Sequence, residues 1–128
     1  MGGHGALYLF EMNPHYFRSS GSLSGLLDLT NWSNHYGISR ILDLPNSENK
    51  DKILWNYSVV GNADKLKSTN KKIIVSCGTE DAFLTNNKYF VEYCKEIGID
   101  VEFIRGRGNH NADYWRSAIV DHFEFFFK

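Results

Sequence analysis

The stretch Lys71-Lys-Ile-Ile-Val-Ser-Cys-Gly-Thr-Glu-Asp81 decides the fold of this chain. Three adjacent apolar residues, Ile73, Ile74 and Val75, predict a strand with both faces buried, as in a parallel sheet that is covered by helices. The polar run Gly78–Asp81 predicts a loop at the carboxyl end of that strand. The stretch therefore indicates a central strand followed by a loop whose polar side chains could take part in catalysis.

Downstream of this strand the chain alternates between helical and extended patterns. Residues 85–97 have helical spacing and end before Gly98, residues 101–105 alternate as a strand does, and residues 112–127 predict a closing helix. The order strand, helix, strand, helix is the βαβ signature, so the predicted fold class is α/β. The apolar residues expected to face the core are Tyr89, Phe90, Tyr93 and Cys94 in the first helix and Trp115, Ile119, Phe123 and Phe126 in the second.

Upstream the pattern is less regular. Residues 3–12 are rich in helix formers and stop before Pro14, and residues 18–24 are small and predict a short strand. Residues 26–67 are irregular, with helical pieces near 38–42 and 50–57.

Composition limits the classes of function. The chain has 128 residues, 42% of them hydrophobic and 15% aromatic, which favours one compact domain over a disordered chain. A net charge of −1 argues against nucleic-acid binding by phosphate neutralisation and against a polybasic membrane anchor. Cys77 and Cys94 are expected to be buried thiols, and no metal site or cofactor is implied.

Two loops are expected to meet at one edge of the predicted sheet. Asp81 follows the 73–77 strand and His110 follows the 101–105 strand, 29 residues later, so neighbouring parallel strands would bring both loops together. An Asp that accepts an imidazole N–H holds the tautomer of the ring and stabilises the imidazolium that forms when His takes a proton. From spacing alone, Asp81 could equally be a helix cap and His110 a solvated loop residue.

Several stretches, in their order and spacing, together resemble one family. These are Met1-Gly-Gly-His-Gly-Ala-Leu-Tyr-Leu9, Asn13-Pro-His-Tyr-Phe-Arg18, Gly21-Ser-Leu-Ser-Gly25, Cys77-Gly-Thr-Glu-Asp81, Gly98-Ile-Asp100 and Gly108-Asn-His-Asn-Ala-Asp-Tyr-Trp115. The chain is similar to the C-terminal half of the esterase family of α/β-hydrolases that includes S-formylglutathione hydrolases, tributyrin esterases, and feruloyl and acetyl-xylan esterases. The glycine-rich start resembles the second half of a nucleophile elbow whose Gly-x-Ser is missing.

This resemblance implies a fold, a set of roles and a departure from the family. Residues 1–128 would be the C-terminal part of a single α/β-hydrolase domain, with the C-terminal strands of a mostly parallel sheet and flanking helices. His110 would be the general base, Asp81 the triad acid, and the backbone of Met1 part of the oxyanion hole. No serine of the chain has elbow flanks, so the resemblance implies a fragment that lacks its nucleophile and is inactive alone.

The resemblance also implies a carboxylic ester hydrolase acting on a small-molecule ester. A carbohydrate-linked acyl group is the first expectation and S-formylglutathione the second. Trp32 and Tyr36 are expected to bind substrate or, equally, to pack in the core or a lid. Two alternatives are a non-catalytic hydrolase-like interaction module and a flavodoxin-like binding domain, and the latter would leave Asp81 and His110 far apart. Without its amino-terminal half, the strand near residues 19–22 would have an unpaired edge, so self-association is expected.

Overall fold

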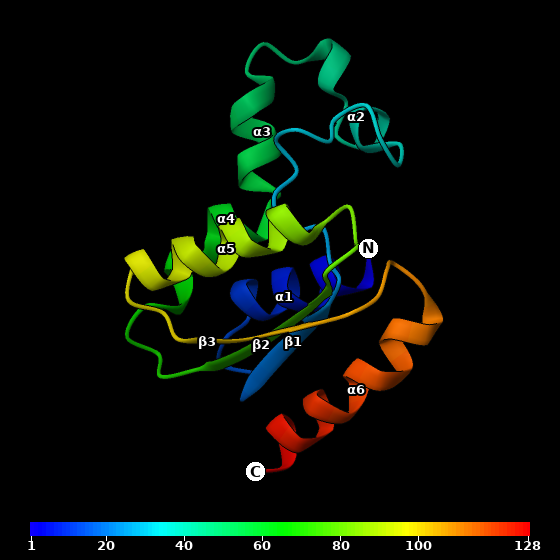
Figure 1. Cartoon of the computed structure of the whole chain (residues 1–128). Helices are drawn as coiled ribbons and strands as arrows, with labels where there is room; N and C mark the ends of the chain where they lie inside the picture. Colours follow the sequence, from blue (N-terminus) through cyan, green and yellow to red (C-terminus); the bar gives the residue numbers. More distant parts are fainter.

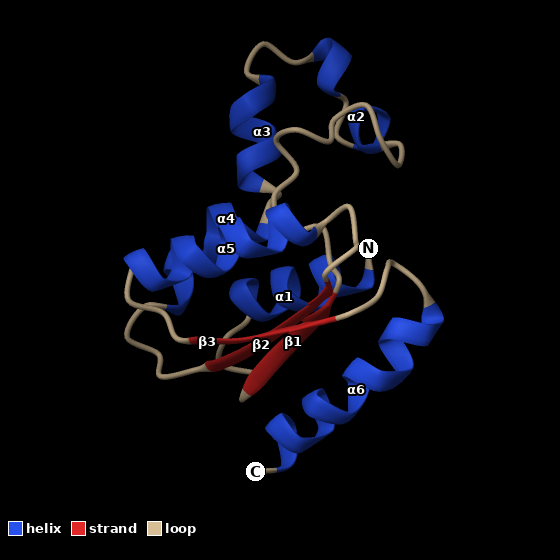
Figure 2. Ribbon diagram, viewed as in Figure 1, coloured by secondary structure: helices blue, strands red, loops and turns tan.

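The buried run at 73–75 lies in the middle strand of a three-stranded parallel sheet, ordered β1-β2-β3, as the ribbon in Figure 2 shows. The computed structural model describes all 128 residues. Ile73, Ile74 and Val75 are at most 1% exposed, so both faces of β2 are buried as the sequence predicted. The strands are β1 (Ser19–Leu23), β2 (Lys72–Gly78) and β3 (Val101–Gly106).

Helices cover both faces of this sheet, and the α/β class is confirmed. One face carries α1, α4 and α5, and the other carries α6 alone (Figure 1). The helices are α1 (Gly2–Met12), α2 (Ile38–Ile41), α3 (Lys50–Asn56), α4 (Val59–Asn62), α5 (Leu84–Glu96) and α6 (Ala112–Phe127), with short 3₁₀ turns at Leu44–Asn46 and Ala63–Leu66. None of these helices is long and apolar enough to cross a lipid bilayer.

The main core lies between the sheet and the three helices on its first face. Ile73 and Val75 of β2 pack there with Leu7 and Phe10 of α1 and with Phe90 of α5. Removing these five apolar side chains from water is the main favourable contribution of this core to the free energy of folding. The core therefore holds α1, and with it the glycine-rich start of the chain, against β1 and β2.

A smaller apolar cluster lies beyond the carboxyl ends of the strands. It is built by the segment between β1 and α4, which projects from the sheet as a separate lobe in Figure 1. Its buried members are Leu26, Leu29, Ile38, Leu44, Leu54 and Phe83, and Trp32 packs against them. Phe83 comes from the loop after β2, so this cluster joins the lobe to that loop.

The inward face of α6 differs from the prediction. Tyr114, Ala118 and His122 are its buried residues, whereas Phe123, expected inside, is 58% exposed. The helix is apolar on several sides, so the apolar spacing did not single out one face. His122, which the sequence pattern did not place on the inward face, is 3% exposed and hydrogen-bonds Ser76 of β2 at 2.8 Å.

The face of α5 is also narrower than expected. Phe90 and Cys94 are fully buried, but Tyr89 is 42% exposed and Tyr93 is only partly buried. The third buried residue is Asn87, whose side-chain amide donates to the backbone oxygens of Gly25 and Phe83. A polar residue thus takes a core position where an aromatic one was expected, and its amide N–H groups are hydrogen-bonded there while its Oδ1 atom has no partner.

Candidate active site at the carboxyl ends of the strands

The loops that follow β2 and β3 lie side by side at the carboxyl end of the sheet. Gly78 is paired with Gly106 in the register of the two strands. The ladder continues beyond them, because the Thr79 N–H donates to the Gly106 oxygen and the Glu80 N–H donates to the Gly108 oxygen, both at 2.9 Å. Parallel pairing therefore carries the two loops to the same place.

Asp81 and His110 meet at this point. The Nδ1 atom of His110 lies 2.9 Å from Oδ2 of Asp81. The Asp81 side chain is 1% exposed, whereas the His110 ring is 40% exposed. A hydrogen bond at Nδ1 leaves the opposite ring nitrogen, Nε2, as the one that can exchange a proton with a third group. The contact is the one that the sequence predicted, and it contradicts the separation that a flavodoxin-like domain would require.

The second oxygen of Asp81 is also held. Its Oδ1 atom accepts a hydrogen bond from the backbone N–H of Phe83 at 2.8 Å. Asp81 is not the cap of α5, whose N-cap is Phe83, but one of its oxygens supports the turn before that helix while the other contacts the imidazole. With both oxygens bonded, the carboxylate has little freedom to turn away from His110.

Two aromatic rings pack perpendicular to the His110 imidazole. Phe83 lies with its centroid 5.1 Å from that of His110, at an interplanar angle of 75°. Trp115, from the first turns of α6, lies 5.0 Å away at 88°. The Trp115 indole N–H donates to the hydroxyl of Ser24, in the loop after β1, at 3.2 Å. The edge-to-face geometry is the one that aromatic pairs prefer, so both rings limit the orientation of His110.

Trp32 and Tyr36 extend this group of aromatic rings away from His110. Trp32 packs edge-on to Phe83 at 4.9 Å and stacks on Tyr36 at 6.2 Å. Tyr36 is 61% exposed, so the outer end of the group faces solvent. The structure thus brings both residues to the same end of the sheet as His110, with Phe83 as the shared contact.

The amino terminus lies at this end as well. Helix α1 begins at Gly2, and a Cβ atom added to Gly3 would stand 2.9 Å from the Gly25 Cα at the end of β1. Only glycine allows so close an approach between the two backbones. Met1 is 62% exposed, and Figure 1 places the terminus labelled N at the end of the sheet where β2 and β3 finish.

The serine hydroxyls near this edge are bonded to other groups. Ser22 accepts from the Gly25 N–H, Ser24 accepts from Trp115, and Ser76 contacts His122 on the α6 side of the sheet. Ser20 donates to the Ala6 oxygen of α1. None of these hydroxyls is bonded to His110.

Burial lowers the pKa of His4, a further histidine near the start of α1. Its Nε2 atom lies 2.7 Å from the Tyr57 oxygen, and its ring stacks on Tyr8. These contacts are those of a residue that joins α1 to the end of α3. No cluster of three or more His, Cys, Asp or Glu side chains has the arrangement of a metal site.

Sequence reasoning missed two features of the site. Glu80, noted only as a polar loop residue, bonds the loop that carries His110, and Phe83 contacts Asp81 through its backbone and His110 through its ring. The position of Phe83, two residues after the candidate acid, was the one available signal. Both features depend on contacts across about 28 residues, which no local pattern encodes.

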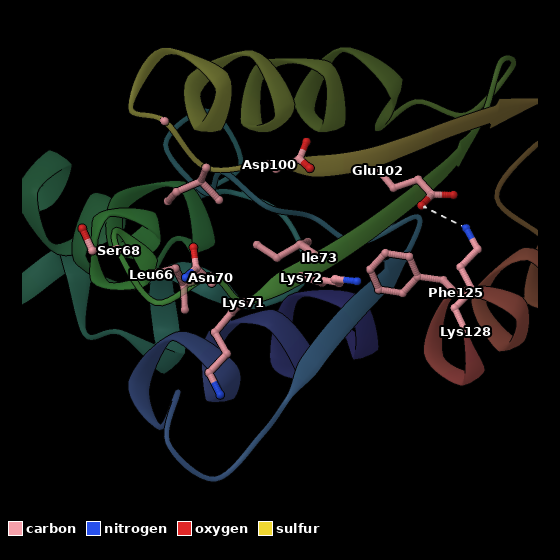
Figure 3. Close-up of a pocket in the computed structure, with 12 residues that line it drawn as sticks. Leu66, Ser68, Asn70, Lys71, Lys72, Ile73, Asp100, Glu102, Phe125 and Lys128 are labelled. Carbon is pink, nitrogen blue, oxygen red and sulfur yellow. Dashed lines mark ion pairs between the residues drawn. The ribbon is translucent and has the colours of Figure 1, made fainter.

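A hollow of about 550 Å³ lies at the opposite end of the sheet (Figure 3). It lies where β2 and β3 begin and where α6 ends, and Glu102 and Lys128 approach each other across it at 4.0 Å. Figure 3 shows Lys71 pointing away from it, and its Nζ atom donates to the Phe17 oxygen. The hollow is therefore separate from the Asp81–His110 pair.

Comparison with known proteins identifies what the chain is similar to. The family model described as "Putative esterase" matches residues 1–126. An acetyl esterase from Caldicellulosiruptor saccharolyticus is 32% identical over 62 residues, which are 48% of this chain and 23% of that protein.

Solved structures share the fold. An S-formylglutathione hydrolase from Staphylococcus aureus superposes with a TM-score of 0.71 at 24% identity, over 98% of this chain and 50% of that one. A ferulic acid esterase superposes with a TM-score of 0.73 at 22% identity, over 98% of this chain and 46% of that one. The chain thus spans about half the length of these structures and about a quarter of the acetyl esterase.

Proposed function

The chain belongs to the esterase family of α/β-hydrolases, and on this premise we propose that it carries the acid and the base of a serine carboxylesterase. The observation that supports the proposal is the 2.9 Å contact between Asp81 and His110, in which the acid is buried and the imidazole is accessible. This is the arrangement that general-base catalysis requires, because the buried acid holds the imidazole in place while the accessible side of the ring can reach a nucleophile.

In the proposed reaction the Nε2 atom of His110 takes the proton of a serine hydroxyl as its oxygen attacks the ester carbonyl carbon. Asp81 holds the Nδ1–H and stabilises the imidazolium that forms. His110 then gives the proton to the leaving alcohol, and an acyl-enzyme remains. Water, deprotonated in turn by His110, attacks the carbonyl carbon of the acyl-enzyme. His110 returns that proton to the serine oxygen as the bond to the acyl group breaks, so the carboxylic acid leaves and the serine is restored. The backbone at Met1, where α1 begins, is proposed as one donor to the oxyanion.

We propose further that the serine lies outside residues 1–128. The serine hydroxyls at this end of the sheet are bonded to Gly25, Trp115 and His122 rather than to His110. The chain also spans about half the length of its structural relatives. On this proposal the 128 residues alone do not hydrolyse esters, because an Asp–His pair without a nucleophile forms no acyl-enzyme.

The proposed substrate is an ester with a small acyl group. An acetyl esterase is among the relatives, and the exposed Tyr36 ring next to Trp32 offers a flat surface on which a sugar or a phenolic ring can stack. A carbohydrate-linked acyl group is therefore the first candidate. S-formylglutathione is the second candidate.

The experiment that tests this function supplies the missing group. A segment that ends in Gly-x-Ser, the first half of the nucleophile elbow, is fused ahead of residue 1. The chimaera is assayed with p-nitrophenyl acetate, acetylated xylo-oligosaccharides and S-formylglutathione. Turnover is expected from the chimaera and not from the 128 residues alone.

Matched variants identify the residues involved. Asp81→Asn should lower kcat about 10⁴-fold, the loss that the triad template shows when the acid no longer holds the correct tautomer. His15→Gln serves as the control and should leave kcat unchanged, because His15 is exposed and lies in the loop between α1 and β1. A folded chimaera without turnover would favour the non-catalytic interaction module instead.

A further inference from the structure

Glu80, the residue before Asp81, makes three hydrogen bonds, two of which join the two loops of the candidate site. Its Oε2 atom accepts from the Gly108 N–H at 2.7 Å and from the Thr79 hydroxyl at 2.6 Å. Its own backbone N–H donates to the Gly108 oxygen at 2.9 Å. Both polar backbone groups of Gly108 are therefore bonded to one residue of the neighbouring loop.

Gly108 is the point at which the His110 loop is attached to the rest of the site. It has φ +146°, a conformation that favours glycine, and an added Cβ would stand 2.9 Å from the Cβ of Tyr114. After Gly108 the loop bonds mainly to itself, because the His110 N–H donates to the Asn109 side chain and the Asn111 N–H to the Asn109 oxygen. The attachment at Gly108 therefore determines where the His110 backbone lies relative to Asp81.

The Glu80 carboxylate is suited to this contact by its charge. The bonds to Thr79 and to the Gly108 N–H lower the pKa of Glu80, so it is ionised at neutral pH and accepts strongly. The nearby Arg107 guanidinium is a weaker partner, at 3.6 Å and with a side chain that is 96% exposed. The specific interaction is thus the one with the backbone of Gly108.

We propose that Glu80 is a positioning residue, which holds the loop of His110 at the distance where Nδ1 reaches Asp81. Glu80 directly precedes Asp81 in the sequence and contacts the backbone of the loop that carries His110. Its proposed effect on the site is therefore exerted through His110. The effect of this role on catalysis rests on the proposed function. The hydrogen bond between Asp81 and His110, which Glu80 is proposed to maintain, does not depend on that function.

The test reads the Asp81–His110 hydrogen bond directly by NMR. The 128-residue chain, labelled with ¹⁵N-histidine, should show a His110 Nδ1–H proton that is shifted downfield and exchanges slowly with water. In Glu80→Ala, loss of the bond to Gly108 should raise the exchange rate of that proton about tenfold or more, the effect of removing one charge-assisted hydrogen bond. Asp81→Asn gives the signal of a broken pair for reference.

Two further variants separate the effect of the hydrogen bond to Gly108 from the effect of charge, and the amide spectrum serves as the control for folding. Glu80→Gln removes the charge but keeps an oxygen acceptor for Gly108, and it should retain an exchange rate within about threefold of the original. Arg107→Gln removes the exposed cation and should change nothing. The amide spectrum away from both loops should stay the same in every variant, which shows that the fold is intact.

Two outcomes would overturn the proposal. Equal exchange rates in Glu80→Ala and in the original chain would show that Glu80 does not position His110. Equal losses in Glu80→Ala and Glu80→Gln would show that the charge acts, and not the bond to Gly108. If the chimaera described above is active, Glu80→Ala should also lower its kcat with little change in KM. If it is inactive, the NMR result still stands by itself.

Discussion

The imidazole of His122 lies 2.8 Å from the hydroxyl of Ser76, so a hydrogen bond inside the molecule fastens α6 to the middle strand of the sheet. The contact is close on the other side too, because a Cβ atom added to Gly21 would stand 2.8 Å from Nδ1 of His122. The ring is therefore enclosed between two strands and its own helix. It has no room for the hydration that a charged imidazole needs.

The first prediction is that His122 lowers the free energy of unfolding in mild acid. Burial lowers the pKa of His122 in the folded chain, with a smaller opposing effect from Asp121. As pH falls below the ordinary value of about 6.5, the unfolded chain binds a proton at this residue and the folded chain does not, so the free energy of unfolding decreases. This slope is measured as a difference between chains, because Glu11 changes stability with pH in the opposite direction in every chain that keeps it. In urea unfolding at pH 5, 6, 7 and 8, the free energy of unfolding of the original chain relative to His122→Leu should fall as pH falls, whereas relative to His15→Gln it should stay constant.

The second prediction concerns Glu11, a carboxyl group in the core. It is 1% exposed, and neither oxygen has a hydrogen-bond partner. Burial raises its pKa to about 9, with a smaller opposing effect from Lys65, so the folded chain keeps it protonated while the unfolded chain ionises it above about 4.5. Stability from this group is therefore lost as pH rises. Glu11→Gln should be more stable than the original chain, by a margin that grows by at most about 1.4 kcal/mol per pH unit.

The measurement for Glu11 is the urea midpoint at pH 5, 6.5 and 8. Glu92→Gln, at an exposed position of α5, is the control and should give a margin near zero throughout. A margin for Glu11→Gln that is constant across this range would contradict the prediction.

The third prediction concerns the close contact that brings the two loops together. A Cβ atom at Gly78 would stand 2.3 Å from the backbone oxygen of Gly108. The backbone at Gly108 could move away from that atom only if the two loops separated. Gly78→Ala should lower the free energy of unfolding by about 1–3 kcal/mol and weaken the His110 Nδ1–H signal. Gly5→Ala, in α1 with open space around the new methyl, should instead raise stability by about 0.5–1 kcal/mol. Chemical denaturation compares the two.

The fourth prediction assigns the outer aromatic residue to substrate preference. Tyr36 is exposed and has φ +55°, so Tyr36→Asn removes the ring and keeps a residue that tolerates this backbone conformation. In an active chimaera, KM for p-nitrophenyl acetate and for a sugar ester should rise about three- to tenfold, with little change for ethyl acetate, which has no ring to stack. Equal effects on all esters would show that Tyr36 does not contact the substrate.

The fifth prediction is self-association of the 128-residue chain. Strand β1 pairs on one side only, and α6 exposes Val120, Phe123 and Phe127, whose side chains are between 54% and 81% exposed. Open strand edges and exposed apolar stripes both favour association. Sedimentation velocity should show oligomers that grow with concentration. Phe123→Glu with Phe127→Glu should reduce them, whereas Ile41→Glu, in the separate lobe, should not. A monomer at all concentrations with a sharp, cooperative thermal transition would contradict the prediction.

Much of the site followed from the order of the strands. Once residues 73–77 and 101–105 were interpreted as parallel neighbours, Asp81 and His110 had to lie at one edge, and their contact at 2.9 Å confirms it. Glu80 could not be assigned in the same way, because its partner is a backbone group 28 residues away. Hydrogen bonds between loops leave no periodic signal in a sequence.

The sequence by itself determined the order of the helices and strands, and the end of the sheet at which the candidate catalytic residues lie. Apolar runs and glycines carry that information, since burial and backbone freedom are properties of single residues and their near neighbours. Only the tertiary structure decided which side of α6 is buried, because Phe123 and His122 could each have faced the sheet. The choice depends on Ser76, a polar residue of β2 that only the inward ring of His122 can reach.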